Sequence, residues 1–159
     1  MKKLKYLIIH CTATRDGQKV TAADIRRWHL SPVSQGGRGW RQVGYSRLFL
    51  LDGVVSVLVA DNGDNWVDSN EITNGVAGIN GESQHICYVG GLDLQSNPTD
   101  TRTDKQRAAM AEYVKSFFNQ HPDILIGGHY QFANKACPCF NVAEWLRSIG
   151  IEEKNILKK

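Results

Sequence analysis

The dipeptide Asp52-Gly53 stands between two β-prone runs, residues 44–51 and 54–60, and is the strongest short-range hairpin signal in the chain. Asp-Gly is typical of hairpin turns because both residues tolerate the positive backbone φ that tight turns require. The chain is therefore expected to contain an antiparallel strand pair.

The other patterned segments alternate between strand and helix along the chain. Short apolar runs predict three more strands, at 5–9, 84–89 and 124–126. Capping boxes at Thr21 and Thr103, and apolar residues at helical spacing, predict helices at 21–30, over about four turns before Pro122, and at 142–148. An antiparallel hairpin among such alternating elements predicts a mixed α/β fold, with a central mixed β-sheet flanked by helices.

The 159-residue length and the lack of repeats or linkers predict a single domain. We expect residues 1–150 to form this domain and residues 151–159 to form a charged, frayed tail. A formal charge of +3 without a dense basic run argues against a nucleic-acid-binding protein. The longest apolar runs are too short to cross a bilayer, so no membrane insertion is expected.

The N-terminal segment, residues 1–9, lacks the long apolar region and the small-residue cleavage site of a signal peptide. Synthesis in the cytoplasm is therefore expected. In such a chain the four cysteines are more readily thiols or metal ligands than a disulfide framework. Only Pro138 separates Cys137 from Cys139, which is poor geometry for a bridge between them.

Three ligand-capable residues fall where loops can converge. His10 lies at the carboxyl end of the first predicted strand, His129 follows the strand at 124–126, and Cys137 comes eight residues later. Strand ends in open sheets are where sites collect. Two imidazoles and a thiolate with one open position would suit a catalytic zinc ion. The spacing alone leaves open that His10 is satisfied by backbone groups and that Cys137 is a small buried hydrophobe.

Four motifs in order resemble the zinc-dependent N-acetylmuramoyl-L-alanine amidases of the phage lysozyme and peptidoglycan recognition protein family (amidase type 2). They are "LIIHCTAT" (7–14), "GWRQVGYSRLFLLDG" (39–53), "ICYVGG" (86–91) and "GHYQFANKACPCF" (128–140). The resemblance implies a mixed sheet flanked by helices and one zinc ion per chain. It also implies hydrolysis of the amide that joins N-acetylmuramic acid to L-alanine of the peptidoglycan stem peptide.

The resemblance also implies roles for five residues. His10, His129 and Cys137 match the zinc ligands of the family, while Tyr45 and Lys135 match its catalytic tyrosine and lysine. Each assignment has a physical basis. Zinc polarises the amide carbonyl and lowers the pKa of bound water to about 7. Lys135 can donate to the oxyanion of the tetrahedral intermediate, and Tyr45 can hydrogen-bond the water and shuttle a proton.

Two positions depart from the family pattern. Cys139 follows the proline of the last motif, where the family often has a small residue, and His85 stands where the family often has glycine. These two departures leave two points undecided: the shape of the groove, and whether Cys139 competes for zinc.

The remaining candidates are interpreted mainly as packing or surface residues. Cys11 follows a ligand on a strand, so its side chain points to the opposite face, into the core, and Cys87 is expected in the core as well. Trp40 is expected to line the substrate cleft. Surface or structural roles are expected for His29, His85 and His121, with His85 near enough to approach the groove. Packing roles are expected for Trp28, Trp66 and Trp145. Solvated positions are expected for Arg38, Arg41 and Arg47, with contact to the acidic stem peptide as the alternative.

Two other functions remain open from sequence. A non-catalytic peptidoglycan-binding module of the same fold is the main alternative, although retention of all five chemical positions argues against it. A nucleic-acid-binding domain has no motif in its favour. For the amidase we expect a peptidoglycan or muropeptide substrate, a monomer, and release from the cytoplasm to act on the cell wall.

Overall fold

A five-stranded mixed sheet forms the centre of the molecule in a computed structural model that describes residues 1–158. Its strands lie in the order β5 (Val55–Val57), β4 (Arg47–Phe49), β7 (Ser83–Tyr88), β2 (Tyr6–Cys11) and β9 (Leu125–Gly128). Only β5 and β4 are antiparallel, and every other neighbouring pair is parallel. The predicted mixed sheet and the hairpin at Asp52-Gly53 are both confirmed, with hairpin strands shorter than the apolar runs suggested.

Two small two-stranded sheets extend this framework. Strand β1 (Lys2–Lys3) pairs with β6 (Trp66–Val67), and β3 (Thr14–Arg15) pairs with β8 (Gly91–Leu92). Strand β6 lies within the polar segment 61–71, which is otherwise irregular. The side chain of Trp66 is 48% exposed, so the packing role expected for it is wrong.

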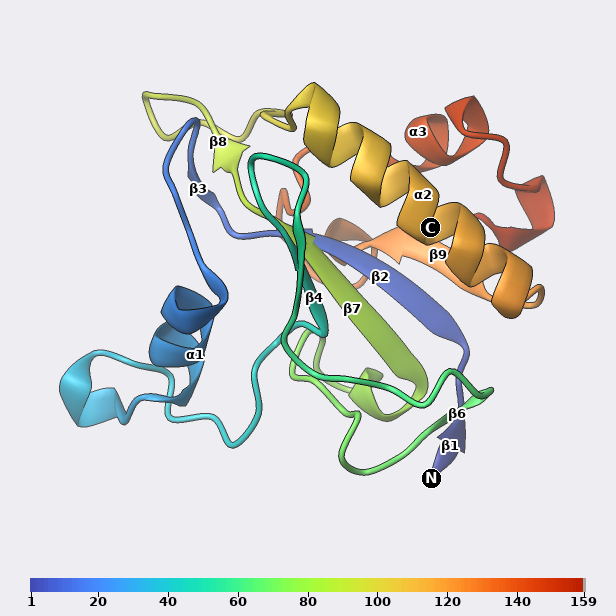
Figure 1. The fold of residues 1–159 in the computed structure, drawn as a ribbon, viewed down its shortest axis with the longest axis horizontal. Helices are drawn as coiled ribbons and strands as arrows, with labels where there is room; N and C mark the ends of the chain where they lie inside the picture. Colours follow the sequence, from blue (N-terminus) through green and yellow to red (C-terminus); the bar gives the residue numbers. More distant parts are fainter. Residues whose placement is uncertain (159) are drawn as a thin grey trace.

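Three α-helices surround the sheet: α1 (Ala22–Leu30), α2 (Asp104–Gln120) and α3 (Val142–Ser148). Thr21 and Thr103 cap α1 and α2 through the predicted capping boxes. Helix α2 has 17 residues, longer than the four turns expected, because it runs unbroken from its cap to the turn at Pro122. Figure 1 shows α2 lying along the central strands and α1 set apart from them, at the lower left.

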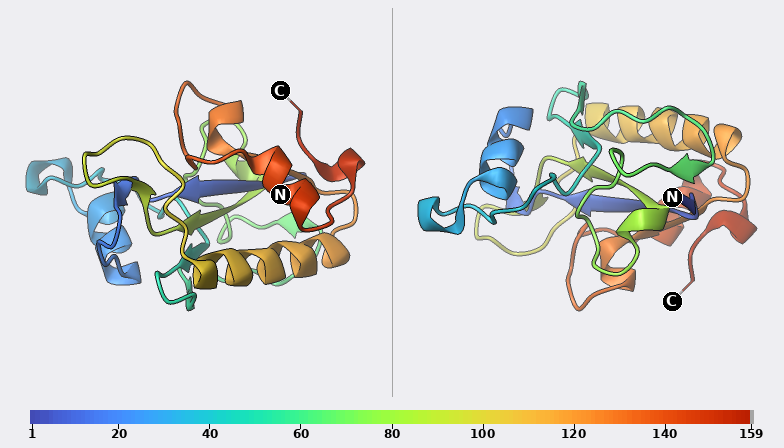
Figure 2. Two further views of the ribbon diagram at one scale, coloured as in Figure 1. Left: turned by 90° about the horizontal axis from the view of Figure 1, so that it is seen from above. Right: turned by 90° about the horizontal axis from the view of Figure 1, so that it is seen from below.

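Strand alternation divides the core into two clusters on opposite faces of the sheet. One contains Ile86 and Tyr88 of β7 together with apolar residues of α2 and α3. The other contains Cys87 of the same strand together with Ile25 of α1 and residues of the hairpin region. Figure 2 shows the strands edge-on with α1 and α2 well separated. Cys11 and Cys87 are buried, as expected.

The C-terminal segment packs against the sheet, so the prediction that it frays is wrong for residues 151–157. Ile151 and Ile156 are buried in the core cluster beneath α2 and α3. The buried side-chain amide of Asn155 donates to the carbonyl oxygens of Pro122 and Ile124 at 2.7 and 2.9 Å. The apolar residues that anchor this segment do not stand out in the sequence, because most of their neighbours are charged or polar.

Arg47 differs from the solvated arginine that was expected. It donates to the carboxylate of Asp61 at 2.8 Å and to the carbonyl oxygen of Val59, and its side chain is only 15% exposed. Among residues 1–158, no helix has the length and apolar character needed to cross a membrane.

Candidate metal centre

Three ligand-capable atoms face one another at one end of the sheet. The Nδ1 atoms of His10 and His129 lie 3.2 Å apart, and Cys137 Sγ lies 3.9 Å from His10 Nδ1. All three ligand atoms lie within 4.8 Å of one another. His10 is buried, while His129 and Cys137 are partly exposed, so the group opens towards solvent on one side.

The order of the strands brings these residues together. His10 lies near the carboxyl end of β2, and β9 pairs with β2 in parallel, so His129 emerges beside it at the start of a 3₁₀ helix (His129–Gln131). Cys137 lies in the loop that follows, and its carbonyl oxygen accepts from the Tyr130 amide at 2.9 Å. The Tyr88 hydroxyl donates to the Pro138 carbonyl at 2.6 Å, which ties the loop to β7.

The donor set and its spacing fit a zinc ion. Tetrahedral bonds of the usual lengths place two nitrogen ligands about 3.3 Å apart and a nitrogen and a sulfur about 3.6 Å apart. The observed separations of 3.2 and 3.9 Å lie close to these values. The Cys11 amide donates to Cys137 Sγ at 3.3 Å, a contact that would stabilise a thiolate.

The electrostatics keep His10 and His129 neutral. Burial lowers the pKa of His10 well below its ordinary value, helped by His85, His129 and Lys135. Burial also lowers the pKa of His129, with Lys135 acting in the same direction. Neutral imidazole is the form that binds metal, so both rings are ready to coordinate at neutral pH.

A cleft of about 650 Å³ opens over this group. All five residues assigned by resemblance line it: His10, Tyr45, His129, Lys135 and Cys137. The Tyr45 ring lies 5.2 Å from the His10 ring between centroids. Burial raises the pKa of Tyr45 well above its ordinary value, so its hydroxyl stays protonated and can donate. Lys135 is exposed at the cleft.

Trp40 and Arg38 also line the cleft, and the Arg38 guanidinium lies over the Trp40 ring, 5.0 Å from its centroid. The expectation for Trp40 is therefore confirmed. Arg38 therefore brings a positive charge to the cleft.

Among the histidines expected at the surface or in structural roles, His29 and His85 are both buried. His29 lines the cleft, and His85 lies behind His10. The His29 ring lies 5.4 Å from the Tyr45 ring, and its Nδ1 accepts from the Gly44 amide at 3.0 Å. His85 contacts His10 directly. The sequence indicated only that His85 could approach the groove, because the contacts of both rings depend on strand register and on the path of residues 40–45. His121, also buried, lies away from the cleft.

Cys139 does not join the candidate ligand group. Its Sγ lies 3.8 Å from Cys11 Sγ, and the group of facing ligand atoms found within residues 1–158 is His10, His129 and Cys137. The loop thus turns its two thiols in different directions, one towards the histidines and one towards Cys11.

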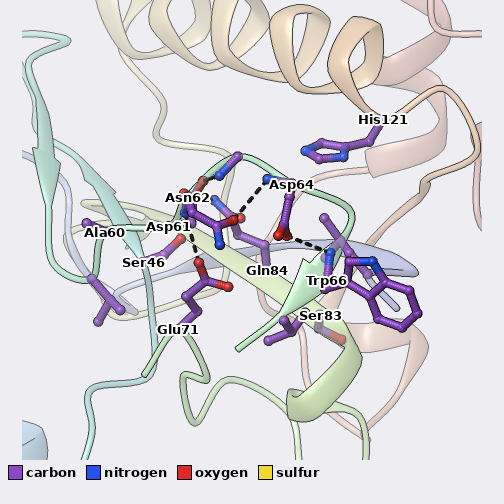
Figure 3. A pocket seen from close by; sticks show the side chains of 14 residues that line it. Ser46, Ala60, Asp61, Asn62, Asp64, Trp66, Glu71, Ser83, Gln84 and His121 are labelled. Carbon is purple, nitrogen blue, oxygen red and sulfur yellow. Dashed lines mark hydrogen bonds between the residues drawn. The ribbon is translucent and has the colours of Figure 1, made fainter. Parts of the chain in front are cut away.

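A second polar pocket is lined by residues of the segment 61–71 together with Gln84 and His121 (Figure 3). Its acidic side chains accept hydrogen bonds from their own loop. Asp64 accepts from the Trp66 amide at 2.8 Å, and Glu71 accepts from the amides of Asn62 and Asp68. These carboxylates are occupied in shaping the loop.

Comparison of the chain with known proteins gives consistent matches. A profile of the family described as N-acetylmuramoyl-L-alanine amidase matches residues 1–140. The endolysin of Enterobacteria phage K11 is 30% identical over 140 residues, which cover 88% of this chain and 83% of the relative. The endolysin of Escherichia phage T7 is 27% identical over 139 residues, covering 87% and 83%.

Solved structures share the fold. The Ph2119 endolysin from a Thermus scotoductus MAT2119 bacteriophage superposes with a TM-score of 0.69 at 24% identity, covering 96% of this chain and 88% of that one. The N-acetylmuramoyl-L-alanine amidase LysC from Clostridium intestinale gives 0.70 at 16% identity, covering 95% and 88%. Bumblebee PGRP-SA gives 0.68 at 20% identity, covering 99% and 86%.

Proposed function

Because the chain belongs to the N-acetylmuramoyl-L-alanine amidase family and is a peptidoglycan amidase, we propose that it uses one zinc ion, held by His10, His129 and Cys137. The substrate bond is the amide between N-acetylmuramic acid and L-alanine of the stem peptide. The observation that supports this proposal best is that three ligand atoms from distant parts of the chain face one another in the cleft.

A zinc ion bound there would supply Lewis acidity towards the amide carbonyl and towards water. Hydrolysis places the hydroxyl of water on the carbonyl carbon, breaks the carbon–nitrogen bond, and releases the L-alanine amine with the remaining proton. The carbonyl oxygen carries negative charge midway through this change. Donors placed where this charge develops therefore lower the barrier.

Two side chains of the cleft are suited to this task. The ammonium group of Lys135 is cationic and solvent-accessible, so it can donate to the oxyanion as charge develops. The Tyr45 hydroxyl keeps its proton at neutral pH because burial raises its pKa. The protonated hydroxyl can orient water by hydrogen bonding, and a proton relay through it towards the leaving nitrogen is the role that the family resemblance implies.

All five proposed residues come from one chain, and we propose that the protein acts as a monomer on peptidoglycan or muropeptides after release from the cell that makes it. Residues 1–150 would form the amidase domain, with the packed segment 151–157 completing its core. Its phage relatives carry the name endolysin, which supports an action on the cell wall.

The test is digestion of purified cell wall by the zinc-loaded protein, with mass spectrometry of the products. We expect free stem peptides with an intact L-alanine amino terminus and uncut glycan chains that have lost them. Cut glycan strands would contradict the proposal. Binding to the wall without any product would favour the non-catalytic peptidoglycan-binding module instead.

A further inference from the structure

His85 is a fully buried residue of β7 to which the reaction proposed above gives no part. Its Nδ1 lies 2.9 Å from Nε2 of His10, on the side of the His10 ring that faces away from the ligand group. Its Nε2 lies 2.9 Å from Oδ1 of Asn80. The imidazole of His85 therefore links His10 to Asn80 in a line of side chains behind the metal centre.

The backbone sets the direction of every hydrogen bond in this line. The Val76 amide donates to Asn80 Oδ1 at 2.8 Å, which identifies that atom as the oxygen of the amide. Because Asn80 Oδ1 only accepts, Nε2 of His85 must carry a proton and donate to it. In the neutral ring, Nδ1 of His85 then accepts.

The same reasoning continues to His10. Since Nδ1 of His85 accepts, Nε2 of His10 must be the donor across the 2.9 Å contact. The neutral His10 ring then has its lone pair on Nδ1, the atom that faces His129 and Cys137. The network selects the one tautomer of His10 that can bind a metal from this position.

Packing also holds the His85 ring in place. A Cβ atom on Gly75 would lie 2.3 Å from ring atoms of His85, so the ring occupies space that any other residue at position 75 would fill. On its other side the ring contacts His10, with 5.0 Å between centroids. The ring is thus fixed between the Gly75 backbone and the metal ligand.

We infer that His85, supported by Asn80, is a positioning residue that fixes the tautomer and ring orientation of His10 and thereby strengthens metal binding. This inference depends on the zinc site of the proposed function. A hydrogen bond from the free N–H of a histidine ligand to a fixed acceptor raises ligand basicity. Loss of such a partner typically weakens metal affinity by about 10- to 100-fold.

The first test measures the zinc dissociation constant by competition with a chromophoric chelator. His85→Leu removes the acceptor and is expected to weaken binding by about 10- to 100-fold. His85→Gln offers an amide oxygen to His10 and an amide N–H to Asn80, so it is expected to restore most of the affinity.

The matched control is His121→Leu. His121 is likewise buried and bonded to an asparagine, with Nδ1 2.8 Å from Asn65 Oδ1, but it lines the other pocket (Figure 3). It is expected to lower stability and leave the zinc dissociation constant unchanged. If His85→Leu weakened zinc binding only by destabilising the fold, His121→Leu would weaken zinc binding to a similar extent.

A second test needs no substitution. Long-range nitrogen-15 NMR spectra of the wild-type protein, before and after zinc is added, report which ring nitrogen carries the proton. We expect Nε2 of both His10 and His85 to be protonated in each state. A proton on Nδ1 of His85 in the zinc-loaded protein overturns the inference, even if His85→Leu fails to fold.

The outcomes separate this inference from the function on which it rests. If the wild type binds zinc and His85→Leu binds it equally well, the positioning role is refuted and the amidase proposal stands. If the wild type binds no zinc, both are refuted. Weakened binding in His85→Leu, recovery in His85→Gln and an unchanged His121→Leu support the role.

Discussion

Residues 61–71 and residues 127–140 are both loop-rich segments with many polar side chains, and each borders a pocket. In the first segment the carboxylates of Asp61, Asp64 and Glu71 accept backbone amides of the same loop. In the second, His129 Nδ1 and Cys137 Sγ point towards His10 on a distant strand. The two regions therefore use their ligand-capable atoms differently.

The difference shows what distinguishes a binding site from a polar loop. Carboxylates that accept local amides are part of the loop's own structure, as in Asx-type turns. Ligand atoms that face one another and accept no amide of their own loop are held in place by the surrounding fold. The four predictions that follow test this contrast, from the largest expected effect to the smallest.

Cys137→Ala is expected to abolish both stoichiometric zinc binding and amidase activity, because it removes one of three ligands. Elemental analysis of the dialysed protein and a cell-wall digestion assay measure the two effects. Cys139→Ala is the matched control from the same loop and should retain zinc, since its thiol faces Cys11. If Cys137→Ala still holds one zinc per chain, the ligand assignment is wrong.

Zinc should stabilise the protein, whereas calcium should not. Zinc is expected to stabilise the metal-free protein by about 4 kcal/mol when it is roughly 1,000-fold above its dissociation constant. Calcium at the same concentration should leave the melting temperature unchanged, because the carboxylates of 61–71 already accept amides. Calorimetry with zinc, with calcium and with a chelator measures the melting temperature in each case. A calcium-dependent rise would show that the contrast between the two loops is false.

Lys135→Ala should keep zinc and lose about 10²- to 10³-fold in turnover, the usual cost of removing an oxyanion donor. Steady-state kinetics on a soluble muropeptide, together with zinc analysis, measure this. Lys115→Ala, on the exposed face of α2, is the control for loss of a surface charge. Turnover within a few-fold of the wild type would remove Lys135 from the mechanism.

Glu71→Ala is expected to lower the free energy of unfolding by about 1–3 kcal/mol, because two backbone amides lose a charged acceptor. Zinc affinity and turnover should not change. Urea denaturation of the zinc-free protein measures this free energy. Glu71→Gln can still accept one amide, so its free energy of unfolding should lie between those of the wild type and Glu71→Ala. A large loss of activity in the folded variant would show that this loop contributes to the site.

Local patterns predicted most of the secondary structure. The capping boxes at Thr21 and Thr103 and the Asp52-Gly53 turn depend on residues within a few positions of one another, so the sequence displays them directly. The C-terminal segment was misjudged because its anchors, Ile151 and Ile156, are isolated among charges. Their burial depends on a distant strand, which Ile156 joins beside Ile126.

For the candidate site, the sequence by itself determined which residues are chemically capable: His10, His129, Cys137, Tyr45 and Lys135 match a family motif and lie at the ends of recognisable elements. Tertiary structure alone decided how they are supported. The line from Asn80 through His85 to His10, and the place of His29 beside Tyr45, arise from strand register and packing between segments far apart in the chain. Hydrogen bonds and packing act over a few ångströms in space, whereas sequence patterns report only neighbours along the chain.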